Sequence, residues 1–224
     1  MAVLQAVLLD WRGTLAVTMT DIQWVEQAFR RLGRVAVAAE IQQVANALLD
    51  AERIPKLAPA WERVDCDAAF HRQTYHRLFT AAGLDPGLAA ALYDAESDPA
   101  HNPFAHDVAP TMEALKQRGM KVGVISDIHF DLRPVFRQHG LADFVDAFTL
   151  SYEHGVQKPD PAFFAIALRK LGAEAGETLM VGDRASHDGA AVAVGIATLL
   201  LPALAHVSDQ RLDLVLKLTA GHTA

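Results

Sequence analysis

The sequence has little of what several classes of protein require. A single cysteine, Cys66, excludes an internal disulfide and a zinc site built from cysteines alone. No cluster of lysine and arginine is longer than two residues and the net charge is −7, which argues against non-specific binding to nucleic acid. No apolar run reaches about 18 residues, so no membrane partner is expected. The N-terminus lacks the basic flank and cleavage site of a signal peptide, and we expect a soluble, cytoplasmic protein.

What the chain does contain is typical of a folded globular protein. Its 224 residues are 51% hydrophobic and 21% charged, which excludes disorder and collagen-like structure. Forty residues are alanine, which favours helices. The length exceeds that of most compact domains and is too short for two large ones, so we expect one domain with a sizeable insertion.

Short apolar runs alternate with helical patterns at the start of the chain and after Pro103. Runs of this kind are typical of strands buried on both faces, and their alternation with helices predicts an α/β fold with a doubly wound parallel sheet. The sheet domain would comprise residues 1–18 and 104–224. Strands are expected at 2–9, 121–125, 148–150, 178–181 and 197–201, and helices at 110–118, 132–139 and 190–194 and after Asp160-Pro161.

Residues 19–103 have a different character and are expected to form an inserted all-helical cap domain. Thr20 and Gln23 have the spacing of a capping box at the start of a first helix. Asp85 followed by Pro86 is a typical start for a later one. Helical spacing of apolar residues continues between these two points, with no convincing strand.

Three of the predicted strands end in an aspartate: Asp10, Asp127 and Asp183. Ligands of open parallel sheets bind at the carboxyl ends of the strands, and Asp10 and Asp183 meet there if their strands are neighbours. Asp188 would lie close by. Carboxylates this close raise one another's pKa unless a cation binds among them, and Mg²⁺ is the ion that suits such oxygen ligands best. The alternative is that these aspartates only cap the helices that follow.

Two further residues fit phosphate chemistry. Ser126, at a helix start, would donate a hydrogen bond to a phosphate oxygen, and Lys158, in a polar loop, would balance the charge of an aspartate and a phosphate. A carboxylate beside Mg²⁺ can attack phosphorus to give an aspartyl-phosphate that water later cleaves.

The order of these motifs resembles the haloacid dehalogenase-like (HAD) hydrolase superfamily, over essentially the whole chain. The helical insertion resembles the C1 cap of its subfamily I. The resemblance implies a nucleophile and Mg²⁺ ligand at Asp10, further metal ligands at the carbonyl of Arg12 and at Asp183, and support of the metal by Asp188. It also implies contact with a small phosphorylated substrate through Thr14, Ser126, Asp127 and Lys158. The motifs are Asp10-Trp11-Arg12-Gly13-Thr14, Ser126-Asp127, Lys158-Pro159-Asp160-Pro161 and Gly182-Asp183 with Asp188.

Arg12 departs from the family pattern. Phosphatases of the family usually carry an aspartate at this position, which protonates the leaving group and then activates water. A guanidinium cannot exchange protons, and loss of a general acid–base typically lowers a rate by about 10²–10⁴. His129 and His187 lie near the motifs and are candidate replacements. Substrates with good leaving groups should be affected least.

Three functions remain open from the sequence. The first is a Mg²⁺-dependent phosphatase for a small phosphorylated compound. The second is a catalytically impaired relative that binds a phosphorylated ligand or a partner protein. The third is a metal-independent 2-haloacid dehalogenase, which Gly182-Asp183 argues against because dehalogenases lack that pair. We expect a monomer or a homodimer.

Overall fold

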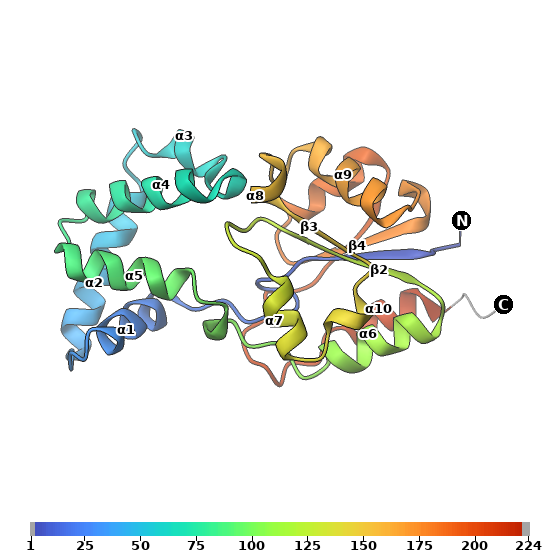
Figure 1. The fold of residues 1–224 in the computed structure, drawn as a ribbon, viewed down its shortest axis with the longest axis horizontal. Helices are drawn as coiled ribbons and strands as arrows, with labels where there is room; N and C mark the ends of the chain where they lie inside the picture. Colours follow the sequence, from blue (N-terminus) through green and yellow to red (C-terminus); the bar gives the residue numbers. More distant parts are fainter. Residues whose placement is uncertain (1–2, 221–224) are drawn as a thin grey trace.

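The computed structural model describes residues 3–220, and its centre is a five-stranded parallel sheet (Figure 1). The strands lie in the order β3–β2–β1–β4–β5, with the first strand of the chain in the middle. Ala2, where the predicted first strand starts, lies outside the described residues, and the strand itself begins at Ala6. The strands are β1 (Ala6–Leu9), β2 (Lys121–Ser126), β3 (Ala147–Leu150), β4 (Thr178–Gly182) and β5 (Ala197–Leu200).

Strand β1 is buried on both faces, as its continuous apolar sequence predicts. Val7 and Leu9 belong to one hydrophobic cluster, and Ala6 and Leu8 belong to another on the opposite face. Strands β1 and β4 pair in parallel, with Leu9 opposite Val181. The residues that follow these two strands therefore emerge side by side at one edge of the sheet.

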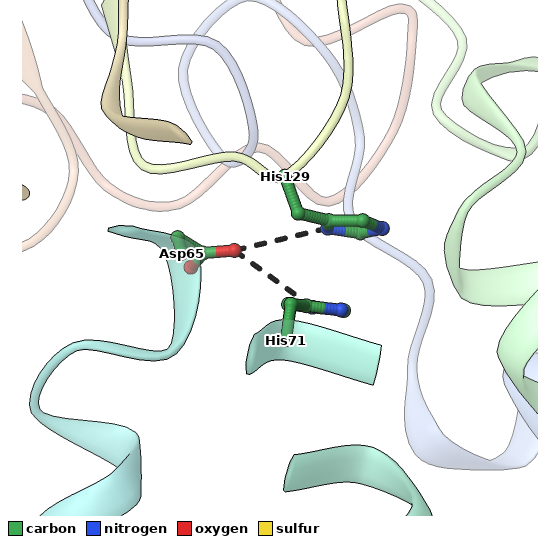
Figure 2. A group of neighbouring side chains, drawn as sticks. All are labelled: Asp65, His71 and His129. Atoms are coloured by element: carbon green, nitrogen blue, oxygen red, sulfur yellow. Dashed lines mark ion pairs between the residues drawn. The ribbon is translucent and has the colours of Figure 1, made fainter. Parts of the chain in front are cut away.

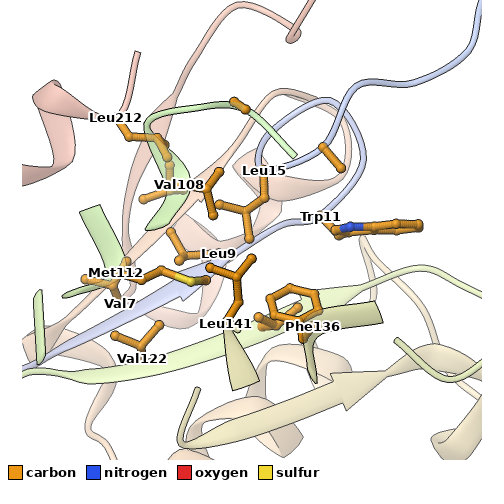
Figure 3. Close-up of a cluster of buried hydrophobic side chains, with 14 of the residues drawn as sticks. Val7, Leu9, Trp11, Leu15, Val108, Met112, Val122, Phe136, Leu141 and Leu212 are labelled. Carbon is orange, nitrogen blue, oxygen red and sulfur yellow. The ribbon is translucent and has the colours of Figure 1, made fainter. Parts of the chain in front are cut away.

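Helices cover both faces of the sheet, so the predicted doubly wound α/β fold is confirmed (Figure 1). Figure 3 shows the cluster on one face, where Met112 and Phe136 pack against Val7 and Leu9. Phe163 and Phe164 fill the other face. The first face is covered by α6 (Val108–Gln117), α7 (Arg133–Gln138) and α10 (Asp213–Leu218), and the second by α9 (Pro161–Leu171) and the 3₁₀ segment η5 (Asp188–Val194).

A helical lobe, formed by α1 to α5, extends to one side of the sheet (Figure 1). It has a hydrophobic cluster of its own around Trp24, Phe29 and Phe79. The capping box of Thr20 and Gln23 is present at its first helix, as predicted. The lobe contains α1 (Asp21–Arg31), α2 (Ala38–Glu52), α3 (Ala58–Trp61), η1 (Val64–Cys66), α4 (Ala68–Ala81), α5 (Pro86–Glu96) and η2 (Pro99–His101).

Two linkers join the lobe to the sheet and run side by side as a short antiparallel ribbon. The N–H of Val17 donates to the carbonyl of Pro103 at 2.9 Å, and the N–H of Ala105 donates to Leu15 at 2.9 Å. The side chain of Asn102 adds a third bond, to the carbonyl of Val17 at 2.9 Å. Both connections are therefore tied to each other before they reach the lobe.

Some short elements differ from the sequence prediction. The segment predicted as a helix at 190–194 is a 3₁₀ helix that begins at Asp188, whose side chain contacts Lys158. Strand β3 leads directly into a helical turn that the sequence did not indicate. The remaining elements are α8 (Ser151–His154), η3 (Ala142–Phe144) and η4 (Ala175–Glu177). Within residues 3–220, no helix has the length and apolar character needed to cross a bilayer.

Candidate active site

Three aspartates meet at the carboxyl ends of β1 and β4. Carboxylate oxygens of Asp10, Asp183 and Asp188 all lie within 4.8 Å of one another. Asp10 follows β1, Asp183 follows β4, and Asp188 opens η5. The sequence predicted this meeting on the condition that the two strands are neighbours, and the pairing of β1 with β4 fulfils it.

Lys158 holds two of these carboxylates together. Its Nζ lies 2.6 Å from Oδ1 of Asp10 and 2.6 Å from Oδ1 of Asp188, and its side chain is fully buried. Burial opposes the charge of the lysine, but the nearby carboxylates raise the pKa of Lys158 above its ordinary value. Burial also raises the pKa of Asp10, and the negative charge of Asp188 adds to that shift, whereas Lys158 opposes it. The lysine is the positive charge that allows two carboxylates to remain this close.

Asp188 is engaged at both of its carboxylate oxygens. Oδ1 accepts from Lys158, and Oδ2 accepts the backbone N–H groups of Asp183 at 3.1 Å and Arg184 at 2.9 Å. Burial disfavours its charge, but these partners outweigh burial and lower the pKa of Asp188. A Cβ on Gly182 would overlap the Asp188 carboxylate, so the close approach requires glycine there. Asp188 thus braces the turn that carries Asp183.

Asp183 has oxygens left for another partner. Its closest hydrogen-bond donor among the described side chains is the hydroxyl of Thr14, at 3.5 Å. It faces Gly13, which has a φ of +79° and whose missing Cβ would overlap the Asp183 carboxylate. Burial raises the pKa of Asp183. The carbonyl oxygen of Arg12 likewise accepts none of the loop and turn hydrogen bonds of the described backbone.

These oxygens form a donor set that fits a hard divalent cation. The second carboxylate oxygen of Asp10, the carboxylate of Asp183 and the Arg12 carbonyl are the kinds of ligand that Mg²⁺ takes in proteins. The glycine at position 13 leaves the space in front of Asp183 open. The three predicted metal carboxylates therefore lie together, with Asp188 bound to protein groups at both oxygens.

The site opens into a cavity of about 640 Å³ between the sheet and the helical lobe. Ser126, only 2% exposed, lines it together with Asp10 and Asp183. Asp127 also lines it, but its carboxylate accepts the backbone N–H of Lys158 at 2.9 Å and the guanidinium of Arg184 at 3.0 Å. The predicted substrate residue Asp127 thus positions the lysine loop and Arg184.

The side chain of Arg12 is directed at the linker to the lobe. Its Nη1 forms an ion pair with the carboxylate of Glu96, and its Nη2 donates to the Glu96 carbonyl at 2.8 Å. Its Nε donates to Oδ1 of Asn102 at 3.3 Å. The guanidinium carbon lies 5.3 Å from the centre of the Trp11 ring. Arg12 thereby connects the loop that follows β1 to the end of α5.

Two histidines from the lobe and the sheet domain stack beside Asp65 (Figure 2). The rings of His71 and His129 are 3.4 Å apart and inclined by 12°, and one nitrogen of each lies 3.8 Å from Oδ1 of Asp65. Nearly parallel rings direct their in-plane lone pairs side by side rather than toward one ion, so this cluster is a poor chelating site. The candidate acid His187 instead contacts Ser186 at 2.9 Å.

Sequence reasoning missed several residues of this site. Glu96 and Asp65 belong to the lobe, where acidic residues are common and carry no motif. Arg184 directly follows the Gly182-Asp183 motif, but nothing in the sequence distinguishes it from a surface arginine. Of the two candidate histidines, His129 contacts Asp65, and the described lining of the cavity contains neither His129 nor His187.

Known proteins resemble this chain in sequence and in fold. The glyceraldehyde 3-phosphate phosphatase of Methanopyrus kandleri is 32% identical over 126 residues, which are 53% of each protein. A crystal structure of a HAD phosphatase from Thermococcus onnurineus matches with a TM-score of 0.64 and 23% identity, covering 98% of this chain and 99% of that one. A dehalogenase solved with an intermediate complex matches with a TM-score of 0.70 and 20% identity, covering 98% and 99%.

The last two likenesses concern the fold alone. The chain spans about half the length of the curated relatives it matches. The family model for haloacid dehalogenase-like hydrolases, in contrast, matches residues 4–195. That match covers most of the chain, including Asp10, Asp127, Asp183 and the loop of Lys158, and the chain belongs to the haloacid dehalogenase-like hydrolase family.

Proposed function

We propose that this protein is a Mg²⁺-dependent phosphatase that hydrolyses a small phosphorylated compound through an aspartyl-phosphate on Asp10. One observation carries the proposal: the Asp10 carboxylate is held by a buried lysine beside Asp183, at the base of a cavity that Ser126 also lines. The phosphatase name of the Methanopyrus kandleri relative supports the same reaction.

Asp10 is oriented for attack on phosphorus. Lys158 donates to its Oδ1, which would form the bond to phosphorus while the bond to the leaving oxygen breaks, and Oδ2 would remain for the metal. Water then attacks the phosphorus of the aspartyl-phosphate and releases phosphate, which restores the carboxylate. Lys158 and the hydroxyl of Ser126 would donate to the phosphate oxygens and stabilise the charge that develops on them.

Asp10, Asp183 and the carbonyl of Arg12 are the residues that would hold Mg²⁺. When bound there, the ion would offset the negative charges of Asp10 and the phosphate and so favour their approach. Asp188 would support the metal site without binding the ion directly, because its oxygens already bind Lys158 and the backbone of the Asp183 turn. Arg184, which lines the cavity and is fixed by Asp127, would add a positive charge toward the substrate.

The helical lobe, residues 19–103, would serve as the cap domain over a sheet domain of residues 1–18 and 104–224. It lines the cavity with Thr20, Gln23 and Asp65, opposite the motif residues of the sheet. A lobe in this place would exclude water during the reaction and select the substrate. The cavity volume suits a small phosphorylated compound.

The proposal is tested by phosphate release from a panel of phosphate esters that includes acetyl phosphate and an aryl phosphate, with Mg²⁺ and with EDTA. We expect release that requires the metal and that the isosteric Asp10→Asn variant lacks. Asp143→Asn, a variant outside the cavity lining, is the control. Chloride release from 2-chloropropionate in EDTA, without phosphate release, would establish a dehalogenase instead. If neither phosphate nor chloride were released from any substrate, the result would favour a relative that only binds a phosphorylated ligand.

A further inference from the structure

The helical lobe supplies the cavity with one group that can exchange a proton. Asp65, in η1 between α3 and α4, lines the same cavity as Asp10 and Asp183, and its side chain is 21% exposed. The other described lobe residues in that lining, Thr20 and Gln23, cannot act as acids. The nucleophile loop has Arg12 where an acid–base would otherwise stand.

The backbone of Asp65 is fixed to the sheet domain on both sides. Its N–H donates to Oε1 of Gln157 at 2.9 Å, and its carbonyl accepts from the hydroxyl of Ser151 at 2.7 Å. Gln157 is the residue directly before Lys158, which holds Asp10. A residue of the lobe is therefore positioned against the loop that carries the catalytic lysine, which is the placement that a group acting on the substrate requires.

The Asp65 carboxyl receives little stabilisation as an anion. No hydrogen bond from the described residues reaches its side-chain oxygens, and ring nitrogens of His71 and His129 lie 3.8 Å from its Oδ1 (Figure 2). The other nitrogens of these rings contact Tyr93 at 3.1 Å and Ser97 at 2.9 Å. Burial lowers the pKa of His71 to about 3 and that of His129 to about 4, so both rings are neutral near pH 7.

The charged groups that face Asp65 come from three other elements. Arg12 of the nucleophile loop, Lys158 and Arg184 all favour the carboxylate, yet burial outweighs them and raises the pKa of Asp65. The positive charges of Arg12 and Lys158 are already shared with Glu96 and Asp10. A raised pKa favours the protonated form of a carboxyl group, and that form is the one that gives a proton to a leaving group.

We propose that Asp65 is the general acid and base of the phosphatase reaction, supplied by the lobe in place of the acid missing at position 12. This inference rests on the proposed function. As Asp10 bonds to phosphorus, the protonated Asp65 gives its proton to the departing alkoxide, which leaves as an alcohol. The Asp65 carboxylate then takes a proton from the water that attacks the aspartyl-phosphate. Phosphate departs, and both aspartates return to their starting states.

The test is the dependence of kcat/KM on the leaving group, measured with p-nitrophenyl phosphate, phenyl phosphate and an alkyl phosphate. Asp65→Asn keeps the shape of the side chain and removes the proton. We expect it to lower kcat/KM for the alkyl ester by about 10²–10⁴ and for p-nitrophenyl phosphate by less than about tenfold, because a good leaving group needs no acid. The aspartyl-phosphate should accumulate in this variant, which mass spectrometry detects, because water lacks its base.

Three variants complete the experiment. Asp65→Glu retains an acid and should recover part of the alkyl ester rate. Glu62→Gln removes a neighbouring exposed carboxylate of the lobe and should leave all rates unchanged. His206→Gln tests the exposed histidine that also lines the cavity.

Two results would overturn the proposal alone. One is an equal loss in Asp65→Asn for every ester, as a purely structural residue would give. The other is the steep leaving-group dependence appearing in His206→Gln instead. If the unaltered protein released phosphate from no ester, the proposed phosphatase function would fail and this proposal with it.

Discussion

Replacing Arg12 should weaken the attachment of the helical lobe more than it changes the surroundings of the Asp10 carboxylate. The side chains of Arg12 and Glu96 are 22% and 15% exposed, so this ion pair is mostly shielded from water. Removing one partner of a buried pair costs about 3–5 kcal/mol because the other charge is left uncompensated. The remaining exposure reduces that cost, and we expect Arg12→Met to lower the free energy of unfolding by about 3 kcal/mol.

The matched change at Glu96 separates the ion pair from packing. No charge is left uncompensated in the double variant Arg12→Met/Glu96→Gln. It should therefore recover about 2 kcal/mol of the unfolding free energy that Arg12→Met loses. A coupling energy of this size is typical of residues in contact. Urea denaturation of the four proteins measures these values. Arg31→Met is the control, because the Arg31–Asp98 ion pair lies in the same region but is more exposed and should contribute at most about 1 kcal/mol.

Two outcomes would refute the reasoning. The first is a loss below about 0.5 kcal/mol in Arg12→Met, and the second is strict additivity of the two single changes.

The sequence alone leads us to expect that Arg12→Asp raises turnover of phosphate monoesters. The structure adds that Asp at this position would face Glu96, so the comparison belongs in the Glu96→Gln background. Unchanged or lower turnover there would mean that Arg12 has a positive role of its own.

Three further predictions follow from the site and its surroundings. Asp10→Asn should abolish metal-dependent phosphate release while leaving the thermal unfolding midpoint near that of the unaltered protein, because Lys158 keeps Asp188 as its ionic partner; residual turnover would assign the nucleophile elsewhere. The folded-state pKa values of His71 and His129, about 3 and about 4, lie below that of an unfolded histidine, so the unfolded chain binds more protons and stability falls as the pH drops below about 6.5. Each ring should cost roughly 2 kcal/mol at pH 5, measured by urea titration, and His129→Gln should flatten that dependence; an unchanged slope would contradict the burial argument. Gly182→Ala, whose Cβ would overlap Asp188, should reduce both stability and activity, whereas Gly176→Ala, which meets nothing within 4 Å, should change neither.

The sheet and the residues at the carboxyl ends of its strands could be predicted because their signals are local. Apolar runs interrupted by Asp10, Asp127 and Asp183 identify buried strands and the residues at their ends, and parallel pairing brings those ends together. Family resemblance placed Lys158 in the same site, and the structure puts its ammonium group between Asp10 and Asp188.

The contribution of the lobe could not be predicted, because it depends on contacts between distant parts of the chain. Glu96 is 84 positions from Arg12, and as a residue at a helix end it has no feature that distinguishes it from other surface acids. Asp65 is held at the cavity by hydrogen bonds from its backbone to the side chains of Ser151 and Gln157, and no spacing in the sequence predicts these contacts. Only the packing of the lobe against the sheet domain reveals these partners.

The ribbon of two linkers decides how the lobe can move. Two segments that are hydrogen-bonded side by side bend out of their common plane more easily than they slide within it. Here the segments run from Leu15 to Val17 and from Pro103 to Ala105. Asn102 binds both Val17 and Arg12, so the ribbon also contacts the loop that follows β1. The lobe should therefore move relative to the sheet more readily across the plane of this ribbon than within it.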